Sequence, residues 1–188
     1  MTELILVTGG ARSGKSTIAE KILNDKENLL YIATSVPFDE EMTDRIIKHR
    51  ERRDNKWHTV EIFENFECLK DNQYFESCQG ILLDCITVML SNRFFYSDMD
   101  EDTTLEQYDE LEKNIVDDIS RLIDLSRSYQ KKLVIVTNEL GMGIVPIDRM
   151  TRMYRDIAGR INQHIAQEAD KVILAISGIG IEIKNQEG

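Results

Sequence analysis

Eight consecutive residues near the start of the chain have the spacing of a phosphate-binding loop. Residues 9–16 fit the pattern G-x-x-x-x-G-K-[ST], with Gly9, Gly14, Lys15 and Ser16 at the fixed positions. The glycines let backbone N–H groups turn inward around an anion. Lys15 can reach the β- and γ-phosphate oxygens, and the Ser16 hydroxyl can ligate Mg²⁺. The spacing predicts a nucleoside triphosphate site with Lys15 as a catalytic residue. The remaining nucleotide-binding members of the loop are Gly10, Ala11, Arg12 and Ser13.

The segments on either side of this loop are those that a phosphate loop requires. Residues 4–8 form a short apolar run suited to a buried parallel strand. Residues 16–23 place Ile18, Ala19, Ile22 and Leu23 at helical spacing. A helix that begins at the loop would direct its N-terminus toward the phosphates.

Polar residues follow two further apolar runs, where open α/β sheets bind their ligands. Residues 29–33 read as a strand that leads into Thr34 and Ser35, which are candidate nucleotide contacts, although a plain turn before a helix fits them equally well. Residues 81–83 lead into Asp84, whose carboxylate is predicted to hold Mg²⁺ directly or through water. The alternative for Asp84 is a helix cap.

A basic helix is predicted over residues 39–53. Five cationic residues face the single acid Glu51 between Arg45 and Arg53, and Arg45, His49 and Arg53 share one helix face. Crowded cations disfavour a protonated imidazole, so His49 is expected to be neutral and nucleophilic. The alternative is a solvated basic helix end.

The remaining pattern alternates strands and helices. Strands are predicted at residues 57–62, with Glu61 near the end, and at 133–137; helices are predicted at 86–95, from about 111 to 129, and at 148–169. Residues 97–106 read as an exposed acidic loop, residues 138–146 as a shaped loop at the ligand-binding edge, and residues 171–176 and 179–184 as a closing hairpin. His58 is expected to be structural, and His164 has no evident partner.

Composition limits the class of protein. The 188 residues suit one domain, 1–188, and a formal net charge of −11 argues against nucleic acid as the main partner. No apolar run approaches the roughly 20 residues of a membrane span, and no signal peptide is visible. Three cysteines without metal-binding spacing favour reduced thiols and a cytoplasmic location.

Seven segments together resemble one known family, the bifunctional adenosylcobinamide kinase / adenosylcobinamide-phosphate guanylyltransferases of cobalamin assembly. They occur in the family's order along nearly the whole chain. They are residues 7–16, 31–35, 45–53 with 57–61, 83–87, 137–146, 155–160 and 177–180.

The resemblance implies a fold, an assembly and two reactions. The fold is that of a P-loop NTPase, a RecA-like, mostly parallel α/β sheet flanked by helices, here with a C-terminal hairpin, and the assembly is a homotrimer. ATP or GTP phosphorylates adenosylcobinamide; GTP then guanylylates a histidine, and GMP passes to adenosylcobinamide phosphate to give adenosylcobinamide-GDP and pyrophosphate. Mg²⁺ is the expected cofactor.

The family's histidine motif corresponds to residues 49–53 of this chain. His49 takes the place of the nucleophile and Arg50 follows it, while the second arginine of the motif is matched by Arg52 or Arg53. Asp54 stands where the family usually has proline. The nucleotide-binding residues implied by the resemblance are Thr34, Ser35, Val36, Arg50, Glu51, Arg52, Arg53, Glu61 and Asp84.

Two other functions are compatible with a phosphate loop. A single-activity small-molecule kinase needs the loop and an acid but no nucleophilic histidine. A non-catalytic nucleotide-switch module would hydrolyse nucleotide slowly, without stimulation by a corrinoid.

Overall fold

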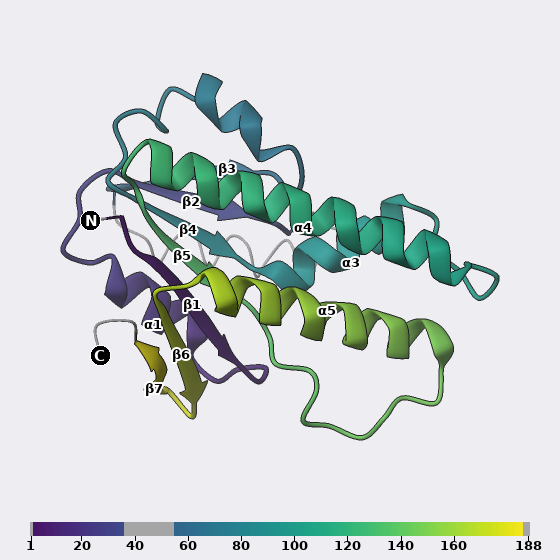
Figure 1. The fold of residues 1–188 in the computed structure, drawn as a ribbon. Coiled ribbons are helices and arrows are strands. Elements are labelled where there is room, and N and C mark those ends of the chain that lie inside the picture. The colour runs from purple at the N-terminus through teal and green to yellow at the C-terminus, as the bar shows by residue number, and fades with distance from the viewer. Residues whose placement is uncertain (1, 36–54, 186–188) are drawn as a thin grey trace.

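The described part of the chain forms one seven-stranded sheet with helices on both faces (Figure 1). The computed structural model describes residues 2–35 and 55–185. The strands are β1 (Leu4–Gly9), β2 (Leu29–Ala33), β3 (Trp57–Glu61), β4 (Gly80–Asp84), β5 (Lys132–Val136), β6 (Lys171–Ile176) and β7 (Ile179–Asn185). The helices are α1 (Lys15–Ile22), the 3₁₀ helix η1 (Phe66–Asp71), α3 (Ile86–Tyr96), α4 (Leu105–Ser128) and α5 (Arg149–Glu168).

The strand order is β3-β2-β4-β5-β1-β6-β7. All neighbouring pairs are parallel except β6 and β7, which form an antiparallel hairpin. The predicted fold class is thereby confirmed: a mostly parallel sheet, flanked by helices and closed by a C-terminal hairpin.

Two apolar layers cover the two faces of the sheet. Alternate residues of each central strand enter opposite layers, as Leu6 and Val7 do in β1. The larger layer lies under α3, α4, α5 and η1, and α4 and α5 run side by side across it (Figure 1). The smaller layer includes Ala19 and Leu23, from α1 and its C-cap. Burial on both faces explains why the central strands are continuous apolar runs.

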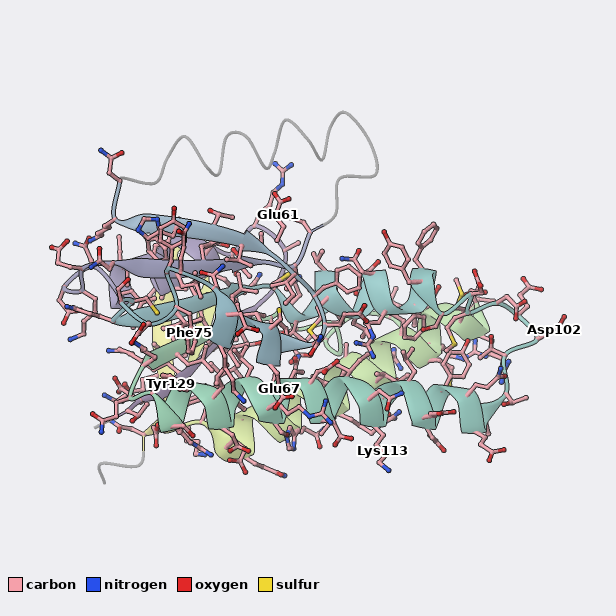
Figure 2. All side chains as sticks on the ribbon, turned by 90° about the horizontal axis from the view of Figure 1, so that it is seen from above. Glu61, Glu67, Phe75, Asp102, Lys113 and Tyr129 are labelled. Carbon is pink, nitrogen blue, oxygen red and sulfur yellow. The ribbon has the colours of Figure 1, made fainter. Side chains whose placement is uncertain are left out.

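The structure corrects the predicted start of one helix. α4 begins at Leu105, inside the predicted acidic loop, because Thr104 forms a capping box with Gln107. Figure 2 shows Asp102 just before this helix and Tyr129 at its other end, where Tyr129 packs edge-on against Phe75 with ring centroids 5.1 Å apart.

Two further outcomes concern the predicted elements. No element was predicted for the stretch that contains η1, and the predicted helix 39–53 lies outside the described residues. None of the described helices combines the length and the apolar character needed to cross a membrane.

Candidate nucleotide site

The strand register brings the predicted site residues to one edge of the sheet. Ala33 is paired with both Glu61 and Asp84, and Val136 is paired with both Asp84 and Val7. Since neighbouring strands are about 4.8 Å apart, Asp84 lies roughly 10 Å from β1 and Glu61 roughly 19 Å from it. Asp84 is therefore at triphosphate distance from the phosphate loop. Glu61 lies farther out, at the end of β3 on the side of the sheet away from α4 (Figure 2).

The phosphate loop joins β1 to α1 through two glycines with backbone angles that other residues rarely adopt. Gly9 has φ +154°, and a Cβ there would lie 2.4 Å from the Ala175 carbonyl oxygen. Gly14 has φ +93° and precedes α1, which begins at Lys15. The first N–H groups of a helix have no acceptor within the helix, so this turn presents donors to an anion.

Neighbouring segments fix the loop at both ends. The Glu139 N–H donates to the Gly9 carbonyl at 3.0 Å, and the Gly178 N–H donates to the Ser13 carbonyl at 2.8 Å. The segment after β5 and the turn of the β6–β7 hairpin thus support the phosphate loop from two sides. The hydroxyl oxygens of Thr8 and Ser13 are buried and have no hydrogen-bond partner among the described residues.

Lys15 is a buried cation in the first turn of α1. Its side chain turns back over the loop, and Nζ donates to the Gly10 carbonyl at 2.6 Å. Burial lowers the pKa of Lys15, an effect that Cys85 and Asp84 partly oppose. Both residues stand at the end of β4, so this end of the strand lies within electrostatic range of Lys15.

Asp84 closes β4 and is oriented by a tyrosine of the neighbouring strand. The Tyr31 hydroxyl donates to Asp84 Oδ2 at 3.1 Å. The N-cap of α3 is Cys85, and no side chain caps that helix end. The helix-cap alternative for Asp84 is therefore wrong. Asp84 is partly exposed at the end of β4.

The side-chain oxygens available at this site suit an Mg²⁺ ion bound together with a nucleotide better than a metal ion held by protein ligands alone. Residues 2–35 and 55–185 contain no group of three or more histidine, cysteine, aspartate or glutamate side chains arranged to hold a metal. Magnesium bound with phosphates needs only one or two protein ligands and prefers hard oxygens. Ser16 in the first turn of α1 and Asp84 at the end of β4 provide such oxygens.

Thr34 joins the ends of two neighbouring strands at the site through its side chain. Its side chain is buried, and Thr34 Oγ1 accepts from the Cys85 N–H and donates to the Cys85 carbonyl, both at 2.8 Å. These bonds join the ends of β2 and β4. Direct contact of Thr34 with nucleotide stays a prediction, as does that of the partly exposed Ser35.

Several predicted site residues lie outside the described part of the chain. They are Val36, His49, Arg50, Glu51, Arg52 and Arg53.

The other two histidines have partners in the structure. His58 stacks on Tyr74 with ring centroids 3.9 Å apart. The expectation that His164 lacks a partner is wrong, because its Nε2 lies 3.1 Å from Ser120 Oγ between α5 and α4.

The sequence pattern predicted that the loop after β5 lies at the ligand-binding edge, but it did not indicate which residue of the loop belongs to the site. The structure places Asn138 there, with its amide on the Thr87 hydroxyl of α3, and Tyr31 against Asp84. Asn138 could have been predicted by the rule that identified Thr34 and Asp84, because it is a polar residue directly after a predicted strand. Tyr31 could not have been found in the same way, because its role depends on β2 lying beside β4.

The fold and the phosphate loop between β1 and α1 define the chain as an α/β protein of the phosphate-loop nucleotide-binding class. Comparison with known proteins narrows the class. Residues 5–183 match the family model described as cobinamide kinase / cobinamide phosphate guanyltransferase, and the chain belongs to that family.

Curated relatives share this similarity over nearly their whole length. The bifunctional adenosylcobalamin biosynthesis protein CobU of Salmonella typhimurium is 45% identical over 96% of this chain and 99% of its own. CobP of Pseudomonas aeruginosa, described in the same words, is 30% identical over 96% of this chain and 97% of its own. Among solved structures, a KaiC-like protein of Pyrococcus horikoshii has a TM-score of 0.50 at 14% identity, covering 92% of this chain and 71% of that one, a likeness of fold alone.

Proposed function

We propose that the described site serves both activities of the family, cobinamide kinase and cobinamide phosphate guanylyltransferase, in cobalamin biosynthesis. The observation that carries this proposal is the family match across residues 5–183, together with a phosphate loop whose lysine lies within electrostatic range of the end of β4. The adenosylated corrinoid is the proposed acceptor. The proposed phosphate donors are ATP or GTP for the first step and GTP for the second.

In the kinase step, the aminopropanol hydroxyl of adenosylcobinamide attacks the γ-phosphorus of the nucleotide. The bond to the β,γ-bridging oxygen breaks, the hydroxyl loses its proton, and the nucleoside diphosphate leaves. Lys15 neutralises charge on the β- and γ-phosphates, and the N–H groups at the start of α1 hold their oxygens.

In the guanylyltransferase step, a neutral ring nitrogen of His49 attacks the α-phosphorus of GTP and pyrophosphate leaves. A phosphate oxygen of adenosylcobinamide phosphate then attacks the same phosphorus and frees the histidine. The three arginines among residues 50–53 would neutralise phosphate charge, and Glu51 lies among them in the sequence. Glu61 lies roughly 19 Å from β1 by strand spacing, which suits the nucleoside end of GTP better than its phosphates.

Ser16 and Asp84 are the proposed ligands of Mg²⁺, which when bound would neutralise phosphate charge. Tyr31 orients the carboxylate by its bond to Oδ2, and Oδ1 is the oxygen that we propose for the metal.

A homotrimer in the cytoplasm is the proposed state of the protein. Free Cys68, Cys78 and Cys85 support a reducing compartment. Exposed isoleucines on the last two strands, Ile176, Ile179, Ile181 and Ile183, support burial against another copy. Sedimentation equilibrium should give three times the 21.7 kDa chain mass, and a monomer mass would contradict the assembly.

The histidine assignment is tested by His49→Ala. This variant should form no covalent GMP adduct and no adenosylcobinamide-GDP, but it should still phosphorylate adenosylcobinamide, because that step needs no nucleophilic histidine. Mass spectrometry after incubation with GTP locates the adduct. A guanylyl mass on a peptide that lacks residue 49 would refute the assignment.

His58→Ala and His164→Ala are matched controls that should retain the adduct. His58 is the second residue of β3, and His164 lies one turn before the end of α5. His58 lies near the amino end of β3, away from the strand ends that carry the site. His164 also lies near the amino ends of the strands, because Asp170, just after α5, donates its N–H to the carbonyl of Leu4 at the start of β1 at 2.9 Å.

A further inference from the structure

Asn138 follows β5 at a position between the two halves of the nucleotide site. β5 lies between β4, which ends in Asp84, and β1, which leads into the phosphate loop. Beyond the last strand pair, the chain continues alongside β1, because Glu139 donates its N–H to the Gly9 carbonyl at 3.0 Å. The backbone of Asn138 is therefore held beside the first residue of the phosphate loop.

The Asn138 side chain extends toward the end of β4, which lies within electrostatic range of Lys15. Its Nδ2 donates to Thr87 Oγ1 at 2.5 Å, and this oxygen lies 3.3 Å from Cys85 Sγ. Cys85 is one of the two residues that influence the charge of Lys15. The preceding Thr137 faces the other way and donates its hydroxyl to Asn162 Oδ1 of α5 at 2.7 Å.

Two partly buried hydrogen bonds from α5 fix both members of the Asn138–Thr87 pair. Tyr154 donates its hydroxyl to the Thr87 carbonyl at 2.6 Å, and Asn162 Nδ2 donates to the Asn138 carbonyl at 3.1 Å. Thr87 and Asn162 are buried, whereas Asn138 is partly exposed. The Asn138 side chain is thus held by bonds to buried residues, while Asn138 itself remains partly exposed.

The chemistry of a fixed amide at this position suits an anion. An amide nitrogen carries two protons, and Thr87 accepts only one of those on Asn138. The groups on either side of Asn138, Lys15 and Asp84, belong to the β- and γ-phosphate end of a bound triphosphate. The second proton is therefore available to an oxygen at that end.

We propose that Asn138 is a nucleotide-binding residue that donates this proton to the terminal phosphate of the bound nucleoside triphosphate. Thr87 orients the amide, and Tyr154 and Asn162 hold the pair in place. The inference rests on the proposed function of the site. It makes Asn138 a residue by which the protein distinguishes a triphosphate from a diphosphate.

The test compares the affinities of two probes, GDP and the β,γ-imido analogue of GTP, by isothermal titration calorimetry. Asn138→Ala should weaken binding of the triphosphate analogue about 10- to 100-fold, the loss expected for a hydrogen bond to a charged group, and leave the GDP affinity unchanged. Asn138→Asp keeps the shape but replaces the donor by a negative charge, so it should weaken the analogue more than alanine does. Thr87→Val should act in the same direction and more weakly, because the amide loses its orientation but not its protons.

Asn114→Ala on the exposed side of α4 is the matched control and should change neither affinity. Equal weakening of both probes by the Asn138 variants would make the residue structural and overturn the inference, as would no change in either. A wild-type protein that binds neither probe would instead refute the nucleotide site itself, and the inference with it.

Discussion

Lys15 carries a positive charge at a position that disfavours it. The side chain is buried, its pKa is lowered by that burial, and Nζ is bonded to a carbonyl of its own loop. Within the described residues Lys15 has no ion pair with a carboxylate, and a buried cation of this kind gains most from an incoming anion. A triphosphate would provide that anion, so the cost of burying the charge is offset on binding.

Asp84→Asn tests the other side of the same site. The amide keeps the size of the carboxylate and can still accept from the Tyr31 hydroxyl, so the fold should persist. A neutral amide is a poorer ligand for a hard cation, so the Mg²⁺ concentration for half-maximal kinase rate should rise about 10-fold or more. Asp109→Asn on the exposed side of α4 is the control. An Mg²⁺ titration identical to that of the wild type would remove Asp84 from the metal site.

α5 is hydrogen-bonded both to the loop after β5 and to the first turn of α3. Its N-terminal half carries Tyr154, whose hydroxyl donates to the Thr87 carbonyl, and its N-cap Asp148 accepts from the Thr151 N–H at 2.7 Å. Burial, followed by the influence of Cys85, raises the pKa of Tyr154 to about 12. The helix therefore depends on a protonated phenol for one of its contacts with the site.

The raised pKa of Tyr154 gives this contact a pH dependence of defined sign. A pKa raised on folding contributes stability that is complete below the unfolded value of about 10 and is lost as the pH rises toward about 12. A shift of two pKa units corresponds to a decrease in the free energy of unfolding on the order of 3 kcal/mol as the pH rises through this range.

Tyr154→Phe removes the hydrogen bond to the Thr87 carbonyl, so it should be less stable than the wild type at neutral pH. The difference should shrink in alkaline solution, because only the wild type then loses stability through its buried phenol. Urea denaturation at a series of pH values measures it, with Tyr96→Phe, which removes an exposed phenol, as the control. A stability difference that stays constant up to about pH 12 would contradict the raised pKa.

Elements with strong local patterns were predictable from the sequence. β2 has the predicted bounds because Leu29–Ala33 is an apolar run buried on both faces, and α5 has them within one residue. The start of α4 was missed because Thr104 and Gln107 form a capping box within an acidic stretch that lacks apolar periodicity. The short 3₁₀ helix η1 gives too few turns for a periodic pattern.

The whole molecule determines which residues meet, and this could not be derived from local patterns. The motif and the strand-end rule identified Lys15 and Asp84 separately. The distance between them depends on the insertion of β5 between β4 and β1, which is a long-range choice of strand order. The Asn138–Thr87 pair and its bonds from α5 arise from the same choice.

The strand order also places the residues proposed for both reactions at the same carboxyl ends of neighbouring strands. The phosphate loop, Asp84 and Asn138 all lie along the ends of β1, β5 and β4. We therefore expect a single nucleotide site, with Lys15 as its cation, to serve both activities.

The most direct test of this claim is to measure both activities in Lys15→Ala. Phosphorylation of adenosylcobinamide and guanylyl transfer from GTP should each fall by about 100-fold or more, because both transition states lose the same cation. The thermal unfolding midpoint should not fall, since a charge that burial disfavours is removed. Either activity remaining above about a tenth of the wild-type rate would contradict this prediction, and loss of one activity alone would show that the two reactions do not share this site.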